Sequence, residues 1–380
     1  MELRLSREQE QWQSKARQFA ETILASHVAR MEQEGAFPRE LLKEMKAHGF
    51  MGLPIPKAWG GEGADFISYI LAIHELSKIS AAAGVILSVH TSVGTLPILH
   101  KGTEEQKEKY VRKLASGDAL GAFALTEPQA GSDASSIGTT ATLVGDYYRL
   151  TGSKIFITNA GVADTYIVFA VTNPFQGVRG ISAFIVEQGS PGFIIGRPEK
   201  KMGLHGSNTC EITLDQVKVP VTQRLGKEGE GFVIAMGTLD GGRIGIAAQA
   251  LGIAHAALEL VDGTDERRRD ERGRKRRRSG ADLDCIASLM TDVEAARLLV
   301  YRAASLRQMG ISCTKESSMA KMFASDTAMR VTGEVVRMLG RQGCTDDYPA
   351  ERLFRDAKVT QIYEGTNEIH RVVISGSMLR

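Results

Sequence analysis

The chain has 380 residues, of which 43% are hydrophobic and 24% are charged, and its formal net charge is +2. This length is more than one hydrophobic core usually fills, so we expect two or three domains, and the hydrophobic fraction excludes a chain that is disordered throughout. The near-neutral charge argues against a protein that is organised as a whole around a polyanion.

Cysteine usage and the N-terminal residues bear on where the protein works. Cys210, Cys285, Cys313 and Cys344 show no CxxC spacing, which favours a reducing compartment over a disulfide framework or a zinc site. The opening MELRLSREQE lacks the apolar core of a signal peptide, and no stretch approaches the ~18 uninterrupted apolar residues of a membrane span. We therefore expect a cytoplasmic protein without membrane association; an organellar matrix after removal of a transit peptide stays open.

Residues 1–121 have the pattern of a helical domain. Ser6 and Gln9 form a capping-box pattern, and apolar residues then recur at helical spacing. Two later helical stretches, FPRELLKEMKAHG and EQKEKYVRKLASG, each end in glycine, as helices commonly do. The Pro- and Gly-rich LPIPKAWGGEGAD is expected to be a loop between them.

The pattern changes after Gly121. Residues 122–222 contain short runs rich in β-branched and aromatic residues, such as YYRLTGSKIFIT and CEITLDQVKVP, separated by turn-forming residues. Few helical stretches lie between these runs, so we expect an antiparallel barrel or sandwich. Residues 223–380 return to helical periodicity. The predicted fold class is α+β multidomain, with helical, β and helical domains in that order.

The segment 265–278, DERRRDERGRKRRR, has nine basic and four acidic residues in fourteen and no apolar periodicity. One interpretation is an arm that binds nucleic acid, and the other is a solvated loop. No aromatic side chains interleave with the basic ones to stack on bases, so we favour the loop and do not expect a nucleic-acid partner.

Common catalytic and cofactor motifs are missing. The sequence contains no GxxxxGK[ST], and Gly61-Glu62-Gly63 follows a Pro-rich loop rather than a strand, so neither a P-loop nor a dinucleotide-binding fingerprint is expected. His74-Glu75 lacks the second histidine of a zincin, and HTSVG at 90–94 lacks the first glycine of a nucleophile elbow. Metal-dependent and serine-dependent hydrolysis both lose support.

Two motifs flank the start of the β region. In FALTEPQAGSD (123–133), small residues around Gly131 let backbone N–H groups approach a planar or phosphorylated ligand; the alternative is an ordinary turn. In KIFITNAG (154–161), Phe156 and Thr158 lie on the same side of a strand, which offers an apolar plate beside a hydroxyl. On strand statistics alone, a plain half-buried strand is favoured there.

Two further motifs belong to the second helical region. In LDGGRIGIAAQALG, Asp240 and Arg243 lie one helical turn apart and could share an anionic ligand or simply pair with each other. In QIYEGTNEI (361–369), Thr366 is a suitable helix N-cap, and Gly365 lets the backbone turn directly after Glu364. Glu364 then projects from a bend, as a catalytic base would. The alternative is a surface carboxylate at the start of a helix, which the residue spacing alone favours.

Together, and in this order, the motifs resemble the acyl-CoA dehydrogenase family over almost the whole chain. KMGLHGSNTCEITLDQVKVP and RDAKVTQIYEGTNEI are similar to family signatures in their expected positions. The closest resemblance is to short-chain, butyryl-CoA-type dehydrogenases. It implies a C-terminal four-helix bundle, an FAD cofactor, an acyl-CoA substrate, a homotetramer, and transfer of electrons to an electron-transfer flavoprotein.

The resemblance also implies roles for individual residues. Glu364 matches the catalytic base, which removes the weakly acidic proton beside the thioester carbonyl. Substrate-binding positions are Ser132, Asp240, Gly241, Gly242, Arg243 and Gly365. FAD-binding positions are Phe123, Leu125, Thr126, Gly131, Ser132, Phe156, Ile157, Thr158, Arg268, Arg337, Gly340, Arg341, Thr366, Asn367 and Glu368.

Two stretches depart from the family pattern. The family's Arg-x-x-Phe-Gly is matched by Arg268, but Glu271 and Arg272 replace its Phe and Gly. Real divergence and a pair of compensating reading-frame shifts in the recorded sequence are both open explanations for residues 261–280. In RMLGRQGC at 337–344, the residues at 337, 341 and 344 replace a Gln, a Gly and an aromatic residue. Both departures concern FAD binding rather than the chemistry.

Two other functions stay open. An acyl-CoA oxidase would keep the flavin but pass its electrons to oxygen. The other alternative is not an enzyme in the ordinary sense: a flavin-containing protein that binds nucleic acid through 265–278 and whose catalysis is vestigial.

Overall fold

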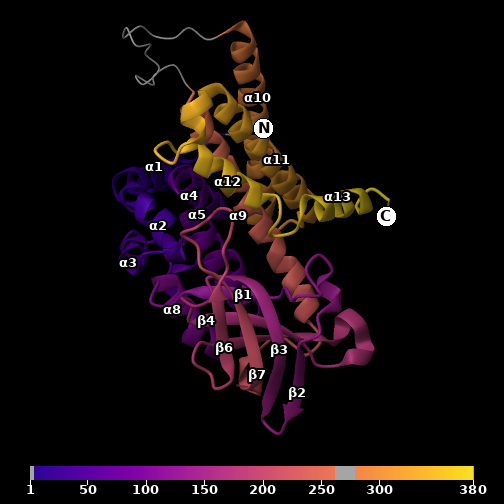
Figure 1. Ribbon diagram of the computed structural model, residues 1–380. Helices are drawn as coiled ribbons and strands as arrows, with labels where there is room; N and C mark the ends of the chain where they lie inside the picture. The colour runs from indigo at the N-terminus through magenta and orange to yellow at the C-terminus, as the bar shows by residue number, and fades with distance from the viewer. Residues whose placement is uncertain (1–3, 262–278, 380) are drawn as a thin grey trace.

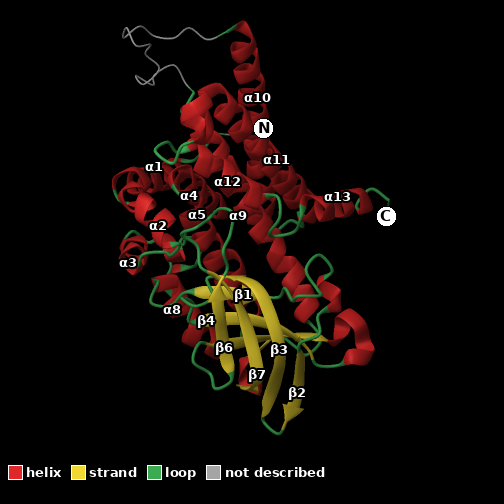
Figure 2. Cartoon of the chain, in the orientation of Figure 1, coloured by secondary structure: helices red, strands yellow, loops and turns green. Residues whose placement is uncertain are grey.

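The computed structural model describes residues 4–261 and 279–379, which form a helical region, a β-sheet and a second helical region (Figures 1 and 2). This confirms the expected order of helical, β and helical parts. The expected division after residue 121 falls within the first strand, and the one after residue 222 falls just before the last strand. The domain boundaries stay a prediction.

The first helical region begins with the predicted capping box. Gln9 N donates to Ser6 Oγ (3.2 Å), and Ser6 N donates to Gln9 Oε1 (2.9 Å). The capped helix buries Ala16, Phe19 and Ala20. The helices are α1 (Arg7–Thr22), α2 (Val28–Glu34), α3 (Arg39–Ala47), α4 (Phe66–Ile79), α5 (Ala81–Ser88), the π-helix η4 (Val89–Thr95), α6 (Leu96–Lys101), α7 (Glu104–Gln106) and α8 (Arg112–Ser116).

The stretch Ala81–Lys101 is, among the described residues, the one helical stretch long and apolar enough to cross a membrane. Nearly all of it is buried inside the protein. It is therefore packed as a core helix of this fold.

The sheet has eight strands, in the order β6-β7-β3-β2-β4-β5-β8, with β1 beside β4. Most neighbours are antiparallel as expected, but β1 and one residue pair of β2 run parallel to β4. Gly94 and Gly121 bring η4 against β1, since a Cβ on Gly94 would lie 3.0 Å from the Gly121 backbone. The strands are β1 (Gly121–Ala124), β2 (Thr140–Val144), β3 (Tyr147–Thr158), β4 (Thr165–Val171), β5 (Ile181–Glu187), β6 (Phe193–Pro198), β7 (Thr209–Pro220) and β8 (Arg224–Leu225).

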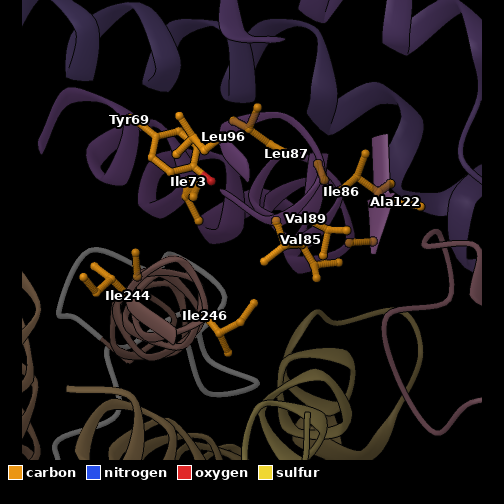
Figure 3. Close-up of a cluster of buried hydrophobic side chains, with 14 of the residues drawn as sticks. Tyr69, Ile73, Val85, Ile86, Leu87, Val89, Leu96, Ala122, Ile244 and Ile246 are labelled. Atoms are coloured by element: carbon orange, nitrogen blue, oxygen red, sulfur yellow. The ribbon is translucent and has the colours of Figure 1, made fainter. Parts of the chain in front are cut away.

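The second helical region is organised around α9, whose central residues are buried on all sides. Figure 3 shows Ile244 and Ile246 of α9 facing apolar side chains from the first helical region, so the two regions share one core. α11 packs against the other four helices of this region. The helices are α9 (Gly231–Glu259), α10 (Gly280–Gln308), α11 (Thr314–Leu339), α12 (Ala350–Thr360) and α13 (Asn367–Gly376).

Candidate active site

Glu364 lies in the turn between α12 and α13 and has a left-handed backbone, with φ of 54°. Gly365 follows with φ of 92°, and Thr366 caps α13 by accepting a hydrogen bond from Ile369 N (3.4 Å). The bend and the N-cap predicted from the sequence are thus both present. A left-handed non-glycine residue costs roughly 1–2 kcal/mol, so the surrounding contacts must hold it there.

The Glu364 carboxylate lies over α9 at Gly242, where a Cβ would be only 2.6 Å from Oε2. The side chain as a whole is half-buried, but Oε2 itself is buried and has no hydrogen-bond partner among the described residues. Burial raises the pKa of Glu364 to about 7, and the positive charges of Arg243 and Lys321 act in the opposite direction. The carboxylate is therefore able to accept a proton near neutral pH.

The residues on both sides of Glu364 are tied to neighbouring helices. The Tyr363 hydroxyl donates to Gln249 Oε1 of α9. Lys321 of α11 donates from Nζ to Gly365 O (2.6 Å) and to Asn367 Oδ1 (3.1 Å). Sequence reasoning missed Lys321, although its spacing from Ser317, Ala324 and Ala328 places it on the buried face of α11.

Asp240 and Arg243 form the ion pair that was one of their two predicted arrangements, with Nη1 and Oδ1 3.1 Å apart. Thr314 Oγ1 also donates to Asp240 Oδ2 (2.6 Å). Arg243 Nε, however, is buried and has no partner among the described residues. The pair therefore does not use the buried Nε donor of Arg243, and a substrate contact by these residues stays a prediction.

The two predicted flavin segments lie side by side, because Ile155 N of β3 donates to Thr126 O (2.9 Å). Phe156 lies on a bulge of β3, with φ of 56°, and is 60% exposed. Thr158 is half-buried at the end of the strand, and Ile157 between them is buried.

The loop that follows β1 is open around its small residues. Gly131 and Ser132 are exposed, and a Cβ on Gly131 would meet no atom within 4 Å. Phe123 packs on Phe169, and Leu125 is buried. An exposed aromatic ring on a bulge beside a hydroxyl and an open glycine loop fits a flat ligand such as a flavin.

A buried ion pair that the sequence analysis missed joins these two segments. Lys154 Nζ lies 2.6 Å from Glu127 Oε1 and 3.1 Å from Leu125 O, and both charged side chains are buried. Glu127 also accepts from the backbone N–H groups of Gly138 (2.6 Å) and Thr139 (3.0 Å). Strand alternation could have indicated that Lys154 is buried, because it lies an even number of residues after the buried Tyr148 and Leu150 on β3.

The remaining predicted cofactor residues divide into two groups. Asn367 is buried in contact with α11, whereas Glu368 is exposed in the first turn of α13. Arg337 lies in the last turn of α11, about 24 Å along the helix from Lys321, and Gly340 and Arg341 follow in the 3-10 helix η9 (Gly340–Cys344). The structure does not bring this second group to the Glu364 turn, and Arg268 lies outside the described residues.

Comparisons with known proteins identify the family. Models of the acyl-CoA dehydrogenase N-terminal, middle and C-terminal domains match residues 6–118, 122–217 and 229–379. An acyl-CoA dehydrogenase of Bacillus subtilis is 56% identical, with 99% of each chain covered. The structure of butyryl-CoA dehydrogenase from Megasphaera elsdenii is 47% identical, with all of each chain covered and a TM-score of 0.97.

A chain in a structure described as the electron transferring flavoprotein of Acidaminococcus fermentans is 50% identical, with all of each chain covered and a TM-score of 0.97. Three findings agree on the family: the match to all three domain models, the high identity over the full chain and the shared fold. The chain belongs to the acyl-CoA dehydrogenase family of FAD-dependent oxidoreductases.

Proposed function

We propose that this protein converts short-chain acyl-CoA thioesters to trans-2-enoyl-CoA, with Glu364 as the base that removes the α-proton. The observation that carries this proposal is the Glu364 carboxylate: its Oε2 is buried and has no hydrogen-bond partner in the described part of the chain, and burial raises its pKa to about 7. The short-chain preference is supported by the likeness to butyryl-CoA dehydrogenase.

The base acts on a proton that is only weakly acidic, so its position and its pKa both matter. Glu364 Oε2 would accept the α-proton, and the N–H of Glu364 would donate to the thioester carbonyl as negative charge develops there. Bound FAD supplies the acceptor for the β-hydrogen, which leaves as a hydride. The Nε donor of Arg243, which has no partner within the residues that the structure describes, is available to an anionic or carbonyl group of the substrate.

The residues that would hold the flavin come from the two segments that Glu127 and Lys154 join. They are Phe123, Leu125, Thr126, Gly131, Ser132, Phe156, Ile157 and Thr158. We assign Thr366, Asn367 and Glu368, together with Arg337, Gly340 and Arg341, to the same cofactor. Since the last three lie at or just beyond the C-terminal end of α11, they would bind a different part of an extended FAD or the FAD of a neighbouring subunit.

We further propose that an electron-transfer flavoprotein accepts the electrons. The likeness to a chain in the Acidaminococcus fermentans structure supports this proposal. Turnover should be fast with that protein and slow with oxygen alone. Fast aerobic production of hydrogen peroxide would instead identify an acyl-CoA oxidase.

We also propose a homotetramer in the cytoplasm. Large apolar side chains are exposed on α10 and α13, and covering them with other copies of the chain would remove that surface from water. These side chains are Leu283, Met290, Leu298 and Val372. All four cysteines are free, which supports a reducing compartment. Light scattering during size-exclusion chromatography tests the assembly, and a monomer would contradict it.

The decisive test is anaerobic addition of butyryl-CoA to the FAD-loaded protein. We expect the flavin absorbance to bleach in the wild-type protein and to stay unchanged in Glu364→Gln, which keeps the shape of the side chain but cannot take the proton. Equal FAD content in both proteins is the control. Unimpaired bleaching in the variant would remove Glu364 from its role.

A further inference from the structure

We propose that Lys321 is the positioning residue that holds the Glu364 turn in its active geometry. This inference rests on the proposed role of Glu364 as the base. Lys321 lies outside the motifs LDGGRIGIAAQALG and QIYEGTNEI, which contain Arg243 and Glu364. It contacts the turn from α11 and precedes Glu364 by 43 positions in the chain.

The turn needs an external support because it contains two consecutive residues with positive φ, Glu364 at 54° and Gly365 at 92°. Glycine adopts this region freely, but glutamate does not. Such a conformation persists only where surrounding contacts fix it. The support before the base is the Tyr363–Gln249 hydrogen bond, and the support after it comes from Lys321.

Lys321 holds the turn at two points. Its Nζ donates to Gly365 O at 2.6 Å and to Asn367 Oδ1 at 3.1 Å, so one ammonium bridges the residue after the base and the first residue of α13. Asn367 is in turn held by Ser325 (2.9 Å) and Asp326 (2.8 Å) of α11. The side chain of Lys321 is fully buried, so water does not compete for these bonds.

The position of Lys321 also places a basic group near the carboxylate. Burial lowers the pKa of Lys321 to about 7, while the negative charges of Glu364 and Asp326 raise it. Other ionisable groups face the turn from each packed helix: Tyr69 of α4, Arg243 of α9, Asp356 of α12, and Glu368 and His370 of α13. Of the positive charges, those of Arg243 and Lys321 lower the pKa of Glu364, and Lys321 is the one that contacts the turn itself.

The test compares Lys321→Met, which keeps the length of the side chain but has no donor, with Ser318→Ala. Ser318 lies on the same helix, is equally buried and, within 4–261 and 279–379, donates to Thr314 O (2.8 Å) of its own helix and to no other group, so its variant is a matched control. We expect kcat per bound flavin with butyryl-CoA to fall on the order of 100-fold in Lys321→Met, with KM nearly unchanged, because a displaced base loses its alignment. The acid limb of the pH profile should move to higher pH.

A second measurement does not depend on turnover. Hydrogen–deuterium exchange in the peptide 361–369 should become faster in Lys321→Met than in the wild type and stay unchanged in Ser318→Ala. Lys321→Gln, which keeps an N–H donor group but carries no charge, should give an intermediate kcat and the same shift of the acid limb. This variant decides the question if Lys321→Met does not fold.

The outcomes separate this inference from the proposed function. If butyryl-CoA does not bleach the wild-type protein, the proposed function fails, and the exchange of 361–369 alone decides the role of Lys321. If the wild type is active and the Lys321 variants keep its kcat and acid limb, the inference is overturned. A lower melting temperature with wild-type kcat and acid limb would make Lys321 a structural residue and would overturn it as well.

Discussion

Gly242 and Glu364 are in contact across the site: a Cβ on Gly242 of α9 would lie 2.6 Å from Glu364 Oε2 and 3.0 Å from Cδ. Gly242 has ordinary helical geometry, so the backbone freedom of glycine is not needed there. What matters is that glycine has no side chain and leaves space for the carboxylate. The position of the Glu364 carboxylate therefore depends on the absence of a side chain at Gly242 in the facing helix.

Gly242→Ala should consequently lower kcat on the order of 10- to 100-fold, because the carboxylate has to move away from the added methyl group. Alanine favours a helix over glycine by up to about 1 kcal/mol, so the variant should still fold. Gly237→Ala, in the same helix, is the matched control, because a Cβ there would meet no atom of another described segment within 4 Å. Steady-state kinetics with butyryl-CoA measure the difference, and equal kcat in both variants would contradict the argument.

The pH dependence of kcat/KM should show an acid limb near pH 7. Burial raises the pKa of Glu364 to about 7, so below that pH the carboxyl is protonated and cannot accept the α-proton. Activity should rise as pH increases through this value. The measurement is kcat/KM with butyryl-CoA from pH 5.5 to 9; activity that stays flat down to pH 5.5 would argue against Glu364 as the titrating base.

The Glu127–Lys154 pair should be more sensitive to the loss of one partner than to the loss of both. Glu127→Gln leaves the buried Lys154 charge without its counter-ion, for which roughly 3–5 kcal/mol of destabilisation is expected. Glu127→Gln with Lys154→Met removes both charges and should restore part of that loss. Urea unfolding monitored by fluorescence and by FAD release measures both. Strictly additive effects would show that the pair does not interact.

Asp356 gives a prediction for stability. Leu204 N donates to Asp356 Oδ1 (2.6 Å), which connects the sheet region to α12. Burial raises the pKa of Asp356 to about 6, from 3.8. Protonation of this carboxyl therefore favours the folded state: the contribution is complete below about pH 3.8 and is lost as pH rises through 6. The difference between these two pKa values corresponds to about 3 kcal/mol.

Asp356→Asn keeps an oxygen for Leu204 but carries no charge, so its melting temperature should equal or exceed that of the wild type at pH 7.5. The advantage should shrink as pH is lowered from 7 to 5. Scanning calorimetry over this range measures both proteins. A variant that melts lower than wild type at pH 7.5 would show that the ionised carboxylate is stabilising.

Features set by neighbouring residues could be predicted from the sequence. The capping box at Ser6 and the N-cap at Thr366 depend on hydrogen bonds over three residues, and both are present. The order of helical and β regions follows from the change in periodicity, which the chain itself carries. Glu364 was found because it lies within a contiguous motif.

Features that depend on distant partners could not be predicted. The parallel pairing of β1 with β4 joins residues 44 positions apart, and the bulge at Phe156 depends on the register with β7. Lys154 and Lys321 were missed because lysine is usually exposed, and their acceptors come from other segments. The ion pair of Asp240 with Arg243 was predicted as one of two arrangements. That Arg243 Nε is buried without a partner, as far as residues 4–261 and 279–379 show, depends on the packing around it.

The strand β1 acts as a rigid joint between the first helical region and the sheet. Its Gly121 packs against Gly94, donates to His90 Nδ1 (3.0 Å) and accepts from Asn159 Nδ2 (3.0 Å). A hinge motion at this joint would have to break all of these contacts, so the two regions should move as one body.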